Sequence, residues 1–151
     1  MAQRFTAISS RPVSSRPSRS HRDASWQVAT NLLVSFKYAG AGLKYAFVTQ
    51  RNFRIHVAVG GVVLGLALWL QLALAQVAIL MLTVGAVMVM ELVNTAIEAV
   101  VDLVVQQSYH DLARIAKDCA AGAVLVSALV SVAVGLVLLA PPLWLRCQAL
   151  F

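Results

Sequence analysis

The stretch VAILMLTVGAVMVMELVNTAIEAVVDLVV, residues 77–105, decides the fold because it is long, apolar and free of proline. Residues 77–90 carry no charge, whereas Glu91, Glu98 and Asp102 follow in its second half. A helix of this length spans roughly 43 Å, more than the ~30 Å hydrocarbon core of a bilayer. We therefore expect a membrane-spanning helix that projects from the hydrocarbon at its carboxylate-bearing end.

The composition of the whole chain supports a membrane location. Hydrophobic residues make up 60% of the 151 residues and charged residues 12%, against roughly 45–50% and 25% in soluble domains. The mean hydropathy is +0.81. These values predict a single integral membrane domain, and we expect no nucleic-acid partner.

Apolar runs and their boundaries give the expected elements. Apolar residues recur beside a basic face at spacings of three, four and seven residues, namely Leu32, Leu33, Phe36, Leu43, Phe47 and Val48. This pattern is typical of an amphipathic helix in the membrane interface. We expect the adjacent prolines Pro141 and Pro142 to end the last helix. The predicted chain has a disordered basic tail (1–26), a membrane domain (27–145) and a C-terminal tail (146–151). Within the membrane domain we expect a surface helix (about 29–52) and three spanning helices (about 55–74, 77–105 and 112–140).

The charge distribution predicts the orientation. Nine of the twelve Lys and Arg residues lie between Arg4 and Arg54. Because basic segments stay in the cytoplasm, we expect a multi-pass protein of the bacterial inner membrane whose carboxylates face the cytoplasmic side. The basic tail fits either contact with anionic headgroups or a targeting signal, and we favour the former. Cys119 and Cys147 lie roughly 42 Å apart on one helix, so we expect no disulfide between them.

Polar residues of the 77–105 helix share one face. At 100° per residue, Glu91, Asn94, Glu98 and Asp102 fall within a stripe about 80° wide. An ionised carboxylate inside a bilayer costs at least a few kcal/mol, so such residues usually have a function. A seam between helices would need fewer polar groups. We therefore favour an active or transport site over a purely structural seam.

The residue types in this stripe suit phosphoryl transfer. Carboxylates with an amide oxygen are ligands for Mg²⁺, which also binds substrate phosphates. A deeper carboxylate, Glu91, could take the proton of a lipid hydroxyl, and Lys117 offers a cation for phosphate. Glycine-rich nucleotide-binding motifs are absent from the sequence. The alternative is a proton- or ion-conducting membrane subunit, although no ionisable residue continues a proton path across the outer half of the membrane. A third possibility is a non-catalytic assembly protein.

Two motifs carry a resemblance to a known family. ELVNTAIEAVVD (91–102) and YHDLARIAKDCAAGAVL (109–125) closely resemble the small prokaryotic integral-membrane diacylglycerol kinases. FKYAGAGLKYAFVTQRNFRIHVAVG (36–60) resembles their surface helix and first span, most closely in the undecaprenol kinase branch. The resemblance implies an all-α membrane protein with an interfacial helix and three transmembrane helices. It also implies a homotrimer with active sites shared between subunits, ATP as co-substrate and Mg²⁺ as cofactor.

The resemblance also implies roles for individual residues. Glu91 matches the catalytic base, and Glu98 matches a metal ligand. Asn52, Phe53 and Arg54 would join Glu91 at the lipid. The nucleotide-binding set is Tyr38, Gln50, Asn94, Glu98, Asp102, Tyr109, His110, Lys117 and Asp118.

One position departs from the family pattern. Gln50 stands where the diacylglycerol kinase branch has a second carboxylate ligand, so it would bind the metal without charge. Gln50 and RNFRIH (51–56) favour undecaprenol as acceptor, while the motif core fits diacylglycerol equally well. We expect His56 to contact a headgroup or a helix rather than to act in catalysis.

Overall fold

The computed structural model describes residues 32–106 and 108–149, so the tail expected at 1–26 lies outside the described residues. The chain divides into two compact units, Met1–Tyr38 and Ala39–Phe151. The elements of the described part are the helices α2 (Leu32–Thr49), α3 (Arg51–Trp69), α4 (Leu74–Val105) and α5 (Asp111–Gln148). The expected all-α fold is confirmed.

Three of these helices are long and apolar enough to cross a membrane, namely α3, α4 and α5. Their 19, 32 and 38 residues correspond to about 28, 48 and 57 Å. The expectation of three helices that could span a membrane is thereby confirmed. Because α4 and α5 are each much longer than α3, they continue beyond the level at which α3 begins.

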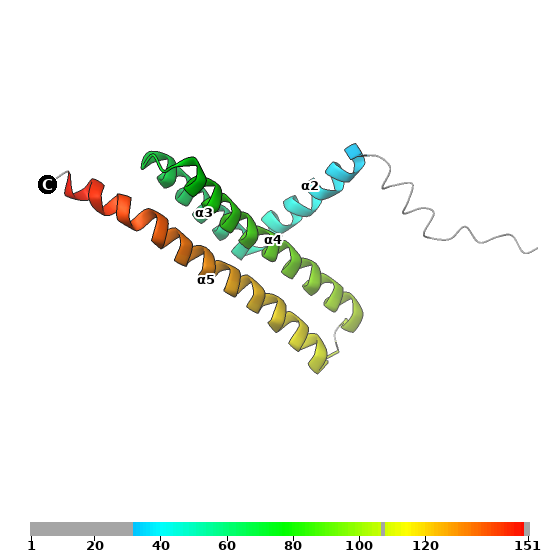
Figure 1. Cartoon of the computed structure of the whole chain (residues 1–151). Helices are drawn as coiled ribbons and strands as arrows, with labels where there is room; N and C mark the ends of the chain where they lie inside the picture. The colour runs from blue at the N-terminus through cyan, green and yellow to red at the C-terminus, as the bar shows by residue number, and fades with distance from the viewer. Residues whose placement is uncertain (1–31, 107, 150–151) are drawn as a thin grey trace, which may run out of the picture. The chain divides into compact units, whose positions relative to one another are not determined.

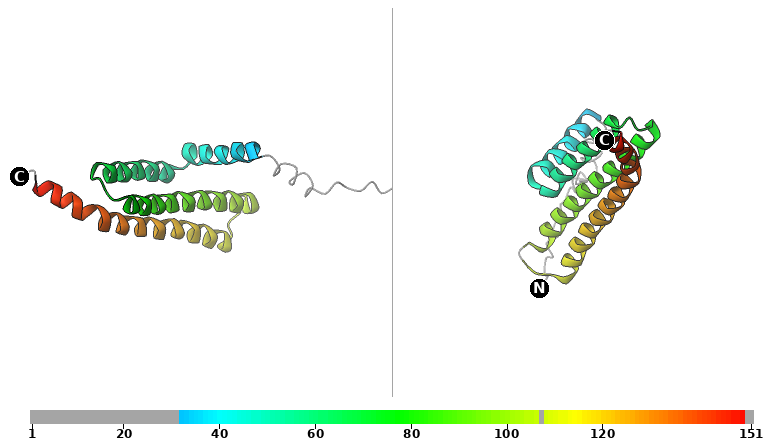
Figure 2. Two further views of the ribbon diagram at one scale, coloured as in Figure 1. Left: turned by 45° about the horizontal axis from the view of Figure 1, so that its top comes forward. Right: turned by 90° about the vertical axis from the view of Figure 1, so that its left-hand side faces the viewer.

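Within the second unit, α4 packs along α5, and α3 packs against the N-terminal part of α4. Figures 1 and 2 show α3, α4 and α5 side by side. A close approach of α3 to α4 is possible because Gly60 has no side chain: a Cβ there would lie 2.6 Å from Val84 Cγ1. The most buried apolar cluster comprises Ala67, Leu70, Leu80 and Leu139. It lies near the turn between α3 and α4, at the end of the helices opposite to the polar stripe.

The turn between α3 and α4 comes slightly earlier than the sequence indicated. Gln71 adopts a left-handed conformation with φ 56°. The N–H of Gln71 donates to Leu68 O at 3.0 Å and that of Leu72 to Ala67 O at 3.1 Å. This pattern is a Schellman motif, which satisfies carbonyls at a helix end. Glycine usually occupies the left-handed position, so Gln71 and Leu72 were a weak signal for the end of a helix.

The expected end of the last helix at Pro141 and Pro142 is wrong, because α5 continues to Gln148. Proline is compatible with helical φ, and membrane helices tolerate the lost N–H donors better than soluble ones. Leu143 packs against the apolar cluster, and the Arg146 guanidinium lies 5.1 Å from the Trp69 ring centroid. These contacts hold the segment after the prolines. Figure 2 shows this segment (red) extending past the turn between α3 and α4.

The junction of α2 and α3 is a single residue, Gln50, in an extended conformation. The Arg54 Nη1 group donates to the carbonyls of Phe47 at 3.0 Å and Val48 at 2.9 Å. These carbonyls belong to the last turn of α2 and have no partner within that helix. Arg54 therefore caps the end of α2.

Candidate active site

The polar stripe of α4 lines a pocket of about 410 Å³ between α3, α4 and α5. We call it the carboxylate pocket. Its polar side consists of Asn52, His56, Glu91, Asn94 and Glu98. Its α5 side is apolar and consists of Ala121, Val124, Leu125 and Ala128. The predicted catalytic base, one predicted metal ligand and one predicted lipid contact thus meet in one place.

Glu91 is the most buried charged residue of the described part, with 3% of its surface exposed. The Thr95 hydroxyl donates to the Glu91 carbonyl at 2.9 Å, which leaves the carboxyl group free for the pocket. Its Oε1 lies 3.3 Å from His56 Nε2, within ion-pair distance. Oε1 nevertheless has no hydrogen-bond partner within the described part.

Asn94 orients the second carboxylate of the pocket. Its Nδ2 donates to Glu98 Oε1 at 3.1 Å, one helical turn further along α4. Its own Oδ1 is buried and has no hydrogen-bond partner among the residues described. Buried acceptors are nearly always satisfied in folded proteins. Asn94 Oδ1 and Glu91 Oε1 therefore favour a ligand that brings a hydrogen-bond donor or a cation.

An apolar groove of about 220 Å³ continues from the carboxylate pocket and shares Ile55, His56 and Ala128 with it. The rest of its lining is apolar apart from Ser131. Val63 and Val84, two of its residues, lie well along α3 and α4 toward their connecting turn. Buried acceptors at the head of an apolar groove suit a ligand with a polar head and a hydrocarbon chain.

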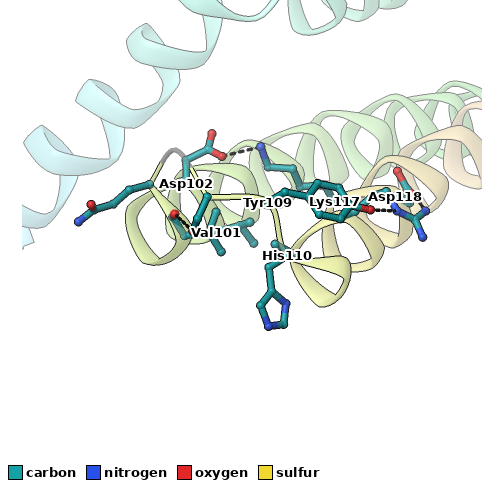
Figure 3. A pocket seen from close by; sticks show the side chains of 11 residues that line it. Val101, Asp102, Tyr109, His110, Lys117 and Asp118 are labelled. Carbon is teal, nitrogen blue, oxygen red and sulfur yellow. Dashed lines mark hydrogen bonds and ion pairs between the residues drawn. The ribbon is translucent and has the colours of Figure 1, made fainter.

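A second pocket, of about 430 Å³, lies where α4 and α5 project past the start of α3. We call it the loop pocket. Lys117 Nζ on α5 lies 2.5 Å from Asp102 Oδ1 on α4, and Figure 3 shows this pair joining the two helices. Asp118, Tyr109 and His110 also line the pocket. Five of the predicted nucleotide-binding residues are therefore brought together.

Tyr109 and His110 differ in their surroundings. The Tyr109 hydroxyl donates to Asp111 Oδ1 at 2.8 Å. His110 is the N-cap of α5, and its Nδ1 accepts from the Leu112 N–H at 3.2 Å. Figure 3 shows its ring turned away from the pair of Asp102 and Lys117. In this conformation His110 shapes the start of α5 and does not point at the ion pair.

Other predicted site residues do not join either pocket. Phe53 is 3% exposed and packs inside the protein. Arg54 caps α2 through Nη1. Gln50 connects two helices and makes no side-chain cap. Tyr38 is exposed and belongs to the first unit. Their proposed contacts with lipid, metal or nucleotide stay predictions.

Two pocket residues with chargeable side chains, His56 and Arg114, were not among the predicted site residues. His56 faces Glu91 on α4, which agrees with the expected helix contact. The sequence did not indicate which residue it would meet, because a linear pattern does not show contacts between helices. Arg114 lines the loop pocket, where its Nη1 donates to Asp118 at 3.0 Å and its Nε to the Tyr109 hydroxyl at 3.3 Å. Arg114 precedes Lys117 by three residues, and such residues share a helix face. That spacing was a usable signal.

The donor set is compatible with Mg²⁺. In the described ranges, no three His, Cys, Asp or Glu side chains form a group that could hold a metal. Mg²⁺ does not require such a group, because it is commonly held by one or two carboxylates together with substrate phosphates and water. Glu98 and the unpaired Asn94 Oδ1 offer hard oxygen ligands in the carboxylate pocket.

Comparison with known proteins places this geometry in a family. Residues 37–139 match the family model described as prokaryotic diacylglycerol kinase. A diacylglycerol kinase of Synechocystis sp. is 58% identical over 134 residues, which cover 89% of this chain and 75% of the relative. An undecaprenol kinase of Bacillus subtilis is 41% identical over 109 residues (72% and 88%). A diacylglycerol kinase of Escherichia coli is 33% identical over 110 residues (73% and 89%). The chain belongs to the prokaryotic diacylglycerol kinase family and is a lipid kinase.

Proposed function

We propose that this protein transfers the γ-phosphoryl group of ATP to the primary hydroxyl of a membrane lipid in a Mg²⁺-dependent reaction. The acceptor is diacylglycerol or undecaprenol. One observation carries the proposal: a buried carboxylate, one oxygen of which has no hydrogen-bond partner in the described part, lies at the head of an apolar groove, and a charged pocket lies further along the same helix.

Glu91 is the proposed general base. The lipid chain would lie in the apolar groove, so that its hydroxyl reaches the carboxylate pocket. Glu91 then accepts the hydroxyl proton as the oxygen attacks the γ-phosphorus, and ADP is the leaving group. A positioned base contributes about 10²–10⁴-fold to the rate. The apolar walls exclude water, which limits hydrolysis of ATP.

Glu98, oriented by Asn94, is the proposed metal ligand, with Gln50 as a second, uncharged ligand. Bound Mg²⁺ would neutralise charge on the phosphates. We expect Glu98→Gln to raise the Mg²⁺ concentration for half-maximal activity by roughly tenfold or more, since a carboxylate is replaced by a neutral amide. A magnesium titration at saturating ATP measures this, and an unchanged midpoint would exclude Glu98 as a ligand.

The loop pocket is the proposed phosphate and nucleotide site. Lys117 and Asp118 would bind the nucleotide there together with Asp102, Tyr109 and His110, while Tyr38 would contribute from the surface helix. The two cations of the pocket, Lys117 and Arg114, are paired with carboxylates. Phosphate oxygens can replace these carboxylates as partners, because they are strong acceptors for both side chains.

The lipid acceptor can be decided with purified protein in lipid bilayer discs. The assay supplies radiolabelled ATP with Mg²⁺ and either diacylglycerol or undecaprenol, and it measures phosphate in the lipid fraction. We expect incorporation with at least one acceptor, and the larger kcat/KM identifies the preferred lipid. ATP consumption without lipid phosphate would contradict the proposal. Proton flux without ATP consumption would support the ion-conducting alternative.

We further propose that the carboxylate and loop pockets face the cytoplasm of a bacterial inner membrane and that three copies form a homotrimer. The chain offers its own probes, since Cys119 and Cys147 are free and exposed near opposite ends of α5. A membrane-impermeant maleimide added outside intact spheroplasts should label Cys147 and spare Cys119. The mass of the detergent-solubilised protein tests the trimer.

A further inference from the structure

His56 is the only described titratable residue outside α4 that lines the carboxylate pocket. The groups that face it there are Glu91 and Glu98 of α4, and α5 contributes none that titrates. Its Nε2 lies 3.3 Å from Glu91 Oε1. The imidazole therefore contacts the same carboxyl group that we propose as the base.

The two groups are close but form no hydrogen bond, unlike an ion pair that only stabilises the fold. Glu91 Oε1 is buried and, although it lies 3.3 Å from His56 Nε2, has no hydrogen-bond partner within the described part. Catalytic hydrogen bonds are often long or poorly aligned without substrate and tighten when it binds.

The position of His56 connects the contact to the lipid. His56 lines both the carboxylate pocket and the apolar groove, and 26% of its side chain is exposed whereas Glu91 is closed off. A lipid whose chain occupies the groove must pass its head beside this ring. Substrate binding would therefore remove the remaining freedom of the imidazole.

We propose that His56 is a positioning residue for Glu91: its Nε2–H donates to Glu91 Oε1 once a lipid alcohol occupies the pocket. The proposal rests on the function given above. The bond fixes one carboxylate oxygen and leaves Oε2 to accept the hydroxyl proton. The lipid oxygen forms its bond to the γ-phosphorus, the bond from that phosphorus to the bridging oxygen breaks, and ADP carries away the electron pair. His56 keeps its proton throughout.

The test compares His56→Gln with His56→Asn. A glutamine amide nitrogen can reach the place of Nε2, whereas the shorter asparagine reaches only the place of Nδ1. Because a hydrogen bond to a charged group is involved, we expect His56→Asn and His56→Ala to lower kcat for lipid phosphorylation by roughly 10- to 100-fold. We expect His56→Gln to stay within about threefold of wild type, and KM for ATP to stay unchanged in all three.

A double-mutant measurement adds a readout that a packing role would not move. In a Glu91→Gln background, His56→Asn should have little further effect on the residual kcat, since the carboxylate that it positions is gone. Ile55→Ala, next to His56 in the same pocket, serves as the control for packing and should affect KM for lipid more than kcat.

Three outcomes would overturn the proposal. They are a wild-type kcat in His56→Asn, equal kcat values in His56→Asn and His56→Gln, and an undiminished effect of His56→Asn in the Glu91→Gln background. If wild-type protein phosphorylates no lipid alcohol, the proposed function itself fails and this inference fails with it. If wild type is fully active and the His56 variants have the same activity, only the proposed role of His56 is excluded. The pair of Gln and Asn keeps the test decisive if His56→Ala does not fold.

Discussion

The carboxylate pocket and the loop pocket are similar in size, about 410 and 430 Å³, and both use the polar stripe of α4. The two pockets differ in whether their polar groups have partners. In the carboxylate pocket, Glu91 Oε1 and Asn94 Oδ1 are buried and have no hydrogen-bond partner among the described residues. In the loop pocket, Lys117 is paired with Asp102 and Arg114 with Asp118, and all four side chains are substantially exposed.

The difference reflects the two environments. Unpaired acceptors between apolar walls have a high cost unless a ligand satisfies them. Exposed ion pairs contribute little to stability, so a nucleotide can exchange their partners at low cost. On the proposed function, α4 would present the base to the lipid, and the cations of α5 would bind the nucleotide beside Asp102. The predictions below separate the two pockets, from the largest expected effect on activity to the smallest.

Removing the base should have the largest effect. We expect Glu91→Gln to lower kcat for lipid phosphorylation by about 10²–10⁴-fold, because the amide cannot accept the proton. The loop pocket does not contain Glu91, so nucleotide affinity should not change. Rates with radiolabelled ATP and a separate nucleotide-binding titration measure both quantities. Near-normal turnover would exclude the role of Glu91 as base.

Removing the inner cation should act mainly through the nucleotide. We expect Lys117→Ala to lower kcat/KM for ATP by roughly 100-fold, since a charge-assisted bond to phosphate is lost. Asp102→Asn is the matched control, because it breaks the same ion pair but leaves the cation in place. Equal losses in the two variants would show that the pair itself, and not phosphate binding, is what matters.

The outer cation should contribute less, because Arg114 is exposed and already paired with Asp118. We expect Arg114→Ala to raise KM for ATP by about two- to fivefold, with kcat for the lipid unchanged. The effect should shrink at high salt, since exposed charges are screened. Arg146→Ala, at the other end of α5, is the control and should leave KM for ATP unchanged at every ionic strength.

The smallest effect on activity should come from the contact that brings α3 to α4. A Cβ at Gly60 would meet the stiff side chain of Val84 at 2.6 Å, whereas one at Gly61 would meet nothing within 4 Å. We expect Gly60→Ala to destabilise the protein by about 1–3 kcal/mol and to raise KM for lipid a few-fold at most. Gly61→Ala should be neutral. Thermal unfolding and lipid titrations test the pair, and equal stability of the two variants would contradict this packing.

Local pattern explains what could be predicted. Helical periodicity alone placed Glu91, Asn94 and Glu98 on one face, because the period of a helix is fixed by its backbone. The three apolar runs could be predicted as helices, because a segment inside a bilayer must satisfy its backbone hydrogen bonds internally. The ends of helices were less certain, as Gln71 and the adjacent prolines Pro141 and Pro142 show, since their outcome depends on contacts with distant segments.

Partnerships between helices could not be predicted in this way. Nothing in the periodicity of α3 or α4 specifies that His56 meets Glu91, that Arg54 caps α2 or that Phe53 is buried instead of facing the pocket. The Arg54 cap depends on the bend between α2 and α3 at Gln50. The contact of His56 with Glu91 depends on the close packing of α3 on α4, which the missing side chain at Gly60 permits.

The sequence by itself determined the membrane class, the three helices that are long and apolar enough to span, and the order of the polar residues along one face of α4. Each of these follows from composition and from spacing within a single helix. Only the tertiary structure decided which residues of α3 and α5 complete the two pockets and which polar atoms remain unpaired. The physical reason is that a polar side chain finds its hydrogen-bond partner among its neighbours in space, and these neighbours lie on different helices.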